Sequence, residues 1–299
     1  MGDRMSRIAI PGLVDILPID DAATIAVIAA DRRFDREYVR RGPMLNRIVL
    51  GRVRSILTLA GAPLPPVAEH GPVRPAPSQS ATQARLDALA AGGLAGPDID
   101  VLAAYVRGEG GATQGGKLAQ QAVGRLFDPY YSADDESWSA ALVLRDAPSS
   151  FNPLKRLIWA LTGRIAKARE LLAGKVNQDP TGLHGTGVAI HNLAEAFARM
   201  RTLYADPAAR GQSSPAAAVA AAMVAPKQVL RQPTVAGTSP AGPFTENTLV
   251  LLQLEKANAR TPGYDMAFMA GSWSACPAQG WVPALLATVW RDAIGGSAQ

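Results

Sequence analysis

Apolar residues recur at helical spacing along most of this chain, and this periodicity limits the fold more than any other feature. Residues 41–61 are a clear case, because Leu45, Ile48, Val49, Val53, Ile56 and Leu57 recur near helical spacing. Hydrophobic residues make up 48% of the 299 positions, mostly as alanine, leucine and valine, whereas aromatic residues make up only 6%. Alanine and leucine favour helix, and β-branched runs are short here. We therefore predict a mainly α-helical fold with a small β element.

Turn-forming residues divide the chain into segments. Gly61 and the prolines after it end a helix expected at residues 36–60, and a proline-rich loop follows at about residues 62–82. The glycine-rich stretch 108–116 lacks the Gly-Lys-Ser/Thr ending of a phosphate-binding loop, so we interpret it as a flexible loop. Residues 249–254 form a short apolar strand or helix. We find no internal repeat and expect a single domain over residues 1–299. Further helices are expected at residues 20–30, 83–91, 98–107, 117–127, 134–145, 151–173, 181–206, 215–230 and 277–293.

The formal net charge of +5 comes mostly from scattered arginines. The densest group is interrupted by aspartates and a glutamate, and we interpret it as a solvated helix face. A nucleic-acid groove would need stacking aromatic residues beside the basic ones, so no nucleic-acid partner is expected. This densest group contains Arg32, Arg33, Arg36, Arg40 and Arg41.

The sequence shows no targeting or membrane-spanning segment. The first 23 residues are broken by prolines and aspartates and do not read as a signal peptide. The longest apolar run, residues 215–226, is about a dozen residues long, which is too short to span a bilayer. One cysteine excludes an internal disulfide and a multi-cysteine zinc site. We expect a cytoplasmic protein with no membrane span.

The single cysteine, Cys276, lies where several local features meet. Taken alone, such a residue is most simply a small buried hydrophobe. Pro277 marks the start of an expected helix, whose amide groups and dipole would favour a thiolate. The five residues before the cysteine are small or flat, which would let a loop pass closely under a planar ligand.

Residues around this cysteine make the C-terminal part of the chain resemble the cytochrome P450 family. Phe268, Gly271, Cys276 and Pro277 hold places comparable to those in the family's heme-ligand loop, which begins with Phe and ends in Cys-x-Gly before a helix. Upstream, residues 225–260 look like the family's helix ending in Glu-x-x-Arg, followed by a turn, a short strand and an Ala-Asn-Arg stretch.

In that comparison Arg231 matches the arginine of the Glu-x-x-Arg helix, although Gln228 stands in place of the glutamate. Residues 181–206 resemble the long distal helix that crosses over the heme, with Thr186 at its threonine. The resemblance covers about residues 180–295, in a chain about three-quarters of the family's usual length. It implies a divergent, shortened P450-like heme-thiolate protein.

The resemblance also implies a cofactor, heme b, with Cys276 as the ligand of its iron. Phe268 and Gly271 would shape the ligand loop, and Trp273 would lie against the proximal face of the porphyrin. The heme propionates need basic or hydrogen-bonding partners. Arg145, seven residues after Trp138 on an expected helix, is a better candidate for this role than Arg231, whose family counterpart is structural.

The implied activity is oxidation of a hydrophobic organic substrate, by a monooxygenase or by a peroxide-driven peroxygenase or peroxidase. Thr186 could be the alcohol of the distal acid–alcohol pair, but Gly185 stands where the family has the acid. A peroxide-driven reaction would not need that acid, and His184 would then be the distal acid–base. His191, two turns further along, reads as a hydrogen-bonded core histidine. A redox partner or a companion subunit is also possible.

Two other classes of function remain open on the sequence alone. The chain could be a non-catalytic helical module that binds a partner protein, with Cys276 only packing in its core. It could also be a heme-thiolate protein that senses or carries heme or a gas and catalyses no reaction.

Overall fold

The computed structural model describes residues 7–59, 62–63, 84, 86–88, 96–147, 153–261 and 263–295. The chain forms two compact units, each assembled from two separate parts of the sequence. Unit 1 contains residues 1–80 and 225–276, and unit 2 contains residues 81–224 and 277–299. All but residues 62–63 of the proline-rich loop predicted at about 62–82, and most of the helix predicted at 83–91, lie outside the described residues.

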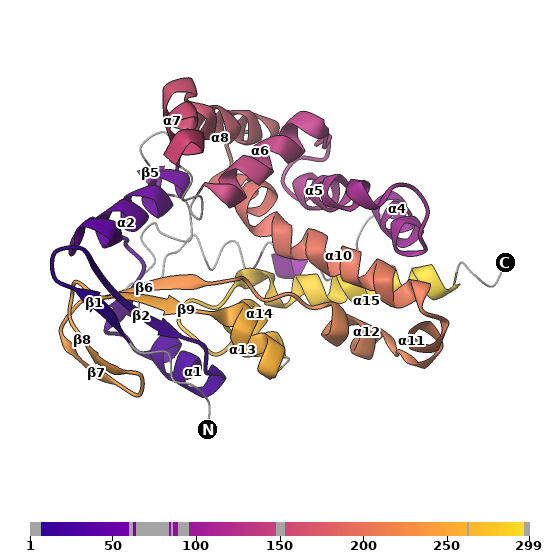
Figure 1. Cartoon of the computed structure of the whole chain (residues 1–299). Coiled ribbons are helices and arrows are strands. Elements are labelled where there is room, and N and C mark those ends of the chain that lie inside the picture. The colour runs from indigo at the N-terminus through magenta and orange to yellow at the C-terminus, as the bar shows by residue number, and fades with distance from the viewer. Residues whose placement is uncertain are drawn as a thin grey trace. The chain divides into compact units, whose positions relative to one another are not determined.

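Unit 1 is built on a five-stranded sheet with the strand order β1-β2-β9-β6-β3 (Figure 1). Strand β2 pairs parallel with β9, and the other neighbours in this sheet are antiparallel. The strands are β1 (Ile8–Ile10), β2 (Val14–Ile19), β3 (Phe34–Asp35), β6 (Val229–Pro233) and β9 (Leu249–Leu252), and two small hairpins pair β4 (Thr58–Leu59) with β5 (Ala62–Pro63) and β7 (Gly237–Ser239) with β8 (Gly242–Phe244).

The core of unit 1 lies between this sheet and its helices. Buried Leu17 and Val250 come from the central strands, while Ile28 and Leu254 come from helices. Burial of these aliphatic side chains away from water is the main favourable contribution to the unit's stability. The helices of unit 1 are α1 (Ala22–Ala30), α2 (Met44–Ile56), α13 (Leu254–Arg260) and α14 (Tyr264–Phe268).

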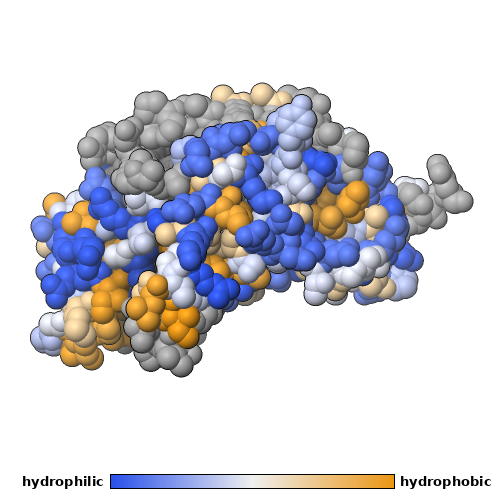
Figure 2. All heavy atoms as spheres, turned by 90° about the horizontal axis from the view of Figure 1, so that it is seen from above, coloured by the Kyte–Doolittle hydropathy of each residue, from blue (hydrophilic) through white to orange (hydrophobic). Residues whose placement is uncertain are grey.

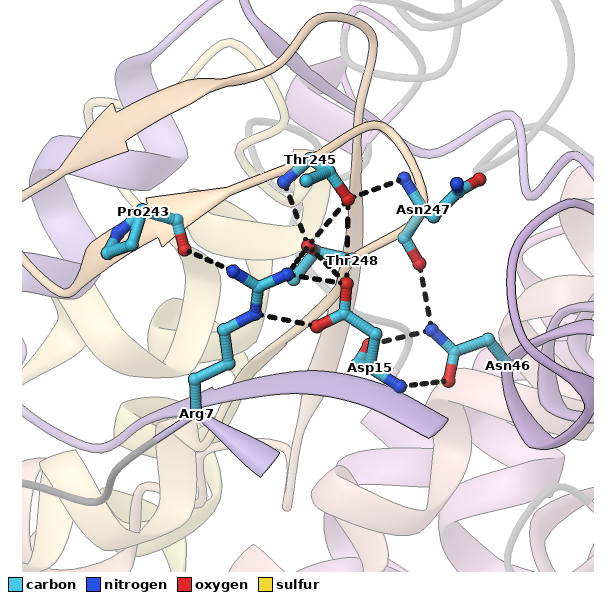
Figure 3. A network of polar contacts seen from close by, with 7 residues as sticks. All are labelled: Arg7, Asp15, Asn46, Pro243, Thr245, Asn247 and Thr248. Atoms are coloured by element: carbon cyan, nitrogen blue, oxygen red, sulfur yellow. Dashed lines mark hydrogen bonds and ion pairs between the residues drawn. The ribbon is translucent and has the colours of Figure 1, made fainter. Parts of the chain in front are cut away.

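A polar network fastens the chain's first strands to the segment before β9 (Figure 3). Arg7 donates to both carboxylate oxygens of Asp15 at 2.7 Å, and the hydroxyl of Thr248 donates to the same carboxylate at 2.8 Å. Fully buried Asn46, on α2, donates to the carbonyls of Asp15 and Asn247. The network therefore ties together parts of unit 1 that are more than 200 residues apart in the sequence.

Unit 2 is helical, and α10 (Ile190–Ala205) packs against helices α4, α5, α12 and α15 (Figure 1). Its buried face includes Leu193, Phe197 and Met200, which recur at helical spacing. The remaining helical segments are α4 (Gly96–Val106), a 3₁₀ turn (Ala112–Gln114), α5 (Gly115–Arg125), α6 (Asp135–Asp146), α7 (Pro153–Thr162), α8 (Arg164–Lys175), α9 (Pro180–His184), a π-helical segment (Gly185–Ala189), α11 (Pro207–Gln212), α12 (Pro215–Ala222), a 3₁₀ turn (Pro277–Gln279) and α15 (Trp281–Gly295).

The face drawn in Figure 2 carries many charged and polar side chains with apolar patches between them. Among the exposed apolar residues of unit 1 are Ile8 and Ile10 on strand β1, at the edge of the sheet. Within the part of the chain that the structure describes, no helix is both long and apolar enough to cross a membrane.

The prediction of a mainly α-helical fold with a small β element is confirmed, but several predicted helices were wrong at their ends. The helix predicted at 36–60 begins only at Met44. Gly42 has φ +85° and Pro43 precedes the first turn, and a residue before proline disfavours the helical conformation. The group of arginines before it is therefore not a helix face: Arg36 follows strand β3 and is partly buried.

Glycine and proline explain three further corrections. The helix predicted at 151–173 breaks at Gly163, which is left-handed, and helix 215–230 ends at Ala222, so that residues 229–233 form strand β6 instead. The helix predicted from Pro277 starts at Trp281, because this places Pro283 in the first turn, where its missing N–H costs nothing. Only a three-residue 3₁₀ turn follows Cys276, so the helix-dipole argument for a thiolate there was wrong.

Candidate functional site

The loop that carries Cys276 is closed by a backbone hydrogen bond. The Cys276 N–H donates to the carbonyl of Phe268 at 2.8 Å, although eight positions separate the two residues. Met269 ends α14 in the left-handed conformation with φ 52°, which turns the chain back. The Ser272 hydroxyl then donates to the Met269 carbonyl at 2.8 Å. The loop is thus a compact turn that holds the thiol of Cys276 at a partly exposed position.

Gly271 occupies a position in this loop that favours glycine. Its φ is +73°, and a residue with a side chain would be strained there. Apart from Gly271 and its two chain neighbours, no atom of the described residues lies within 4 Å of the position that a Cβ would take, so the strain comes from the backbone and not from crowding. The structure therefore brings Phe268, Gly271 and Cys276 into one turn.

Arg231 joins strand β6 to the same loop from the interior of unit 1. Its side chain is fully buried and donates to the Leu230 carbonyl, the Met269 sulfur and the Ser274 hydroxyl. Its Nε is buried and has no hydrogen-bond partner among the described residues. Burial lowers the pKa of Arg231, because the charged form loses its hydration. The family comparison placed Arg231 on a helix, and that placement was wrong, since the residue lies on a strand.

Trp273 lies beside two arginines. The guanidinium carbons of Arg231 and Arg36 each lie 5.3 Å from the centroid of the Trp273 ring. Burial and the nearby charge of Arg231 lower the pKa of Arg36 to about 10, while Tyr38, Cys276 and Asp35 oppose that shift. The Nε of Arg36 is also buried, without a hydrogen-bond partner in the described parts of the chain.

The electrostatics of this cluster are unbalanced. Asp35 is the carboxylate that acts on both arginines, and its Oδ1 accepts the backbone N–H of Arg36. Tyr38, buried close by, has its pKa raised by burial, so its hydroxyl stays neutral. One fully buried cation and one partly buried cation beside one carboxylate leave a net positive charge, which is costly without an anion. The cluster of Arg36, Trp273 and Arg231 is called the arginine–tryptophan cluster below.

Sequence reasoning missed Arg36 as a site residue, although a signal was present. Phe34 is fully buried on strand β3, and Arg36 is two positions later. Residues i and i+2 of an extended chain point to the same side. The alternation Phe34–Arg36 therefore indicated that the arginine is directed inward. We did not make this prediction because we interpreted the segment as a helix.

In unit 2, the predicted distal helix is a continuous helical stretch with a π-helical segment inside it. Asp179 caps its start by accepting the N–H groups of Thr181 and Gly182. The Thr186 hydroxyl donates to the Gly182 carbonyl at 2.8 Å, and the Thr186 carbonyl accepts from the buried Gln120 amide at 3.0 Å. A π-helical turn widens the helix locally and is frequent at functional sites.

The histidines and Arg145 of unit 2 have different surroundings. His184, at the end of α9, is partly buried. The ring of His191 lies 5.3 Å from that of Trp138, its Nε2 is 3.0 Å from the Ala141 carbonyl, and burial lowers its pKa to about 4. Arg145 is half exposed and pairs with Asp146 at 2.9 Å. The interpretation of His191 as a hydrogen-bonded core residue thus fits its contacts, while Arg145 stays a predicted propionate partner.

No protein family's sequence profile matches this chain, and no curated protein matches it by sequence. Several solved structures match the chain by fold. The cytochrome P450 enzyme CxnD, for C–S bond formation in chuangxinmycin biosynthesis, matches with a TM-score of 0.57 at 12% identity, over 94% of this chain and 80% of that chain. CYP175A1 from Thermus thermophillus gives 0.51 at 12% identity, over 95% and 82%. CYP105P1 in complex with filipin I gives 0.50 at 11% identity, over 96% and 83%.

The chain therefore has the fold of the cytochrome P450s. This confirms the mainly α-helical, P450-like fold that the sequence predicted, in a form that has diverged far in sequence. The resemblance from sequence covered about residues 180–295, whereas the structural likeness extends over nearly the whole chain.

Proposed function

We propose that this protein is a heme-thiolate oxidoreductase in which Cys276 is the ligand of the heme iron. The observation that carries the proposal is the pairing of a partly exposed thiol with the arginine–tryptophan cluster, at one loop of a P450 fold. A thiolate ligand increases the electron density on heme iron and favours O–O cleavage.

The residues around Cys276 fit a heme. Porphyrin propionates are carboxylates and bind best to guanidinium groups. Arg231 is a fully buried guanidinium whose Nε has no partner among the described residues, and those residues give its side chain no hydrogen bond to a carboxylate. Trp273 offers a flat aromatic surface, and Gly271 leaves open space above the loop backbone. In this proposal Phe268 and Gly271 shape the loop, Cys276 binds iron and Arg231 binds a propionate.

The substrate class that we propose is a hydrophobic organic molecule, and the oxidant is hydrogen peroxide. Gly185 cannot hold or transfer a proton, so the chain lacks the acid of an acid–alcohol pair at that position. The hydroxyl of Thr186 is committed to the Gly182 carbonyl, which fixes its orientation. His184 is then the group we assign to proton transfer, because a histidine titrates near neutral pH. The alternative is a reaction with dioxygen and a redox partner, and a test must distinguish it from the peroxide-driven reaction.

The first test uses the fact that the chain has one cysteine. Heme-free and heme-loaded protein are treated with iodoacetamide, and alkylation is followed by intact mass. We expect bound heme to protect Cys276, and Cys276→Ala to lose the thiolate spectrum. Equal alkylation rates with and without bound heme would contradict ligation by Cys276. The proposed role of His184 in proton transfer is tested by peroxide-driven oxidation of a hydrophobic dye. Wild type and His184→Ala are compared, and unchanged turnover in the variant would contradict this role.

A further inference from the structure

Arg36 is a partly buried cation to which neither the fold nor the proposed iron ligation gives a role. It lies on the segment between strand β3 and helix α2, far in sequence from the Cys276 loop, yet its guanidinium contacts Trp273. Burying a guanidinium is unfavourable unless a charged or hydrogen-bonding partner compensates for the lost water. The structure gives its buried Nε no such partner among the described residues.

The neighbours of Arg36 do not supply this compensation. Arg231 has the same charge, and Tyr38 is a neutral phenol. The Asp35 carboxylate accepts the backbone N–H of Arg36, and none of the hydrogen bonds described for its side chain joins it to the guanidinium. Arg33 and Arg41, on the same segment, have partners of their own in Asp31 and the Pro233 carbonyl. The Nε of Arg41 is also buried without a described partner, but Arg36 differs from both neighbours because no hydrogen bond is described for any nitrogen of its guanidinium.

We propose that Arg36 is a second carboxylate-binding residue beside Arg231, and that the two guanidinium groups hold the two propionates of one porphyrin next to Trp273. A guanidinium presents paired N–H donors that match both oxygens of a carboxylate. Arg36 is only partly buried by its surface area, so a carboxylate can reach it. This inference rests on the proposed heme function for the identity of the ligand, whereas the carboxylate chemistry follows from the cluster itself.

Iron-free protoporphyrin IX tests this role without the iron–thiolate bond. Heme-free protein is titrated with the free diacid and with its dimethyl ester, and binding is followed by quenching of tryptophan fluorescence. We expect wild-type protein to bind the diacid at least about tenfold more tightly than the ester, since hydrogen bonds between charged groups are the strong ones. Arg36→Gln should weaken diacid binding about tenfold and leave ester binding unchanged, and Arg36→Lys should retain part of the preference.

Arg32→Gln is the matched control, because it removes the same charge from an exposed residue of the same segment. It should bind both porphyrins as wild type does. If Arg36→Gln does not fold, as judged by circular dichroism, Arg36→Lys takes its place, and a diacid affinity in Arg36→Lys equal to that of wild type would count against the inference. Equal binding of diacid and ester by wild type, or an unchanged diacid affinity in folded Arg36→Gln, would overturn the inference.

Two further arms separate this inference from the proposed function. Cys276→Ala should keep the preference for the diacid, because iron-free porphyrin does not need the thiolate. If wild-type protein prefers the diacid but its heme-loaded form shows no thiolate spectrum, the carboxylate site stands and the iron ligand does not. Dodecanoate is titrated as a carboxylic acid without a porphyrin. If dodecanoate binding depends on Arg36 and diacid porphyrin binding does not, the site takes a free carboxylic acid, and the assignment to propionates is overturned.

Discussion

The Arg231 guanidinium donates to the hydroxyl of Ser274 in the interior of unit 1, and this hydrogen bond joins strand β6 to the loop of Cys276. The same nitrogen also reaches the Met269 sulfur at 3.4 Å. Strand β6 is held in turn by β9, with Arg231 opposite Val250. The position of the cysteine loop is therefore set by a buried arginine that the sheet holds in place.

Replacing Arg231 tests whether this residue contributes mainly to heme binding or to the stability of the fold. We expect Arg231→Met to leave the unfolding free energy of the heme-free protein unchanged or to raise it, because removing a buried charge that no described carboxylate pairs with offsets the loss of its hydrogen bonds to Leu230, Met269 and Ser274. Heme affinity should fall by about tenfold or more, since a propionate loses its partner. Urea unfolding of heme-free protein and heme titration measure the two effects. A loss of more than about 2 kcal/mol in the heme-free protein would show that Arg231 is mainly structural.

The network around Asp15 predicts a pH-dependent stability (Figure 3). Burial acts to raise the pKa of Asp15, but hydrogen bonds from Arg7 and Thr248 and the charge of Arg7 outweigh it, so the pKa is lowered. A carboxylate with a lowered pKa stabilises the fold above its unfolded value of about 3.9, and this contribution is lost as the pH falls through the folded value. We expect Asp15→Asn to lower stability by roughly 2 kcal/mol at pH 7.

The difference in unfolding free energy between wild type and Asp15→Asn should disappear as the pH is lowered below about 4. Urea unfolding across this range measures it, and Asp135→Asn, which removes the same charge at an exposed residue, is the control. A difference that persists unchanged in acid would mean that packing, and not the carboxylate charge, accounts for the effect.

His191 should destabilise the protein in mild acid. The unfolded chain takes up a proton near pH 6.5, whereas burial keeps the folded histidine neutral down to about pH 4. Stability should thus fall between these two pH values, by a total on the order of 3 kcal/mol. His191→Gln should lack this part of the pH dependence. Unfolding curves for both proteins at pH 7, 5 and 4 test this, and parallel losses in the two would exclude His191 as the cause.

Gly124 on α5 should not tolerate a side chain. A Cβ at this position would overlap the buried ring of Tyr131. We expect Gly124→Ala to lower the free energy of unfolding by about 1–3 kcal/mol. Gly174→Ala, at a helical glycine with open space around it, is the matched control and should raise stability by up to about 1 kcal/mol. Equal effects of the two substitutions in thermal unfolding would contradict the packing of Tyr131 on α5.

The sequence could predict what local periodicity and turn residues determine. The apolar spacing placed α5 and α6 within about two residues of their observed bounds, and the small and flat residues before Cys276 marked its loop. These features depend on neighbours within a few positions along the chain. The P450 resemblance, drawn from the order of segments near the C-terminus, was confirmed for the fold as a whole.

Features that depend on distant partners were not predictable in the same way. Strand β6 reads as a continuation of an alanine-rich helix until its pairing with β9 is known. The alternation at Phe34 and Arg36 is a local signal, but the partner of Arg36 is not predictable, because nothing near it in sequence shows that Trp273 packs against it. Propensity is a weak local signal that tertiary packing overrides. The site roles of Thr186, His184 and Arg145 stay predictions.

The most direct test of ligation by Cys276 is an absorption spectrum of heme-loaded protein, reduced with dithionite and exposed to carbon monoxide. We expect a Soret band at the strongly red-shifted position of a thiolate ligand, and its loss in Cys276→Ala. A band at the ordinary histidine-type position in wild type, or the same red-shifted band in Cys276→Ala, would contradict a heme held by Cys276.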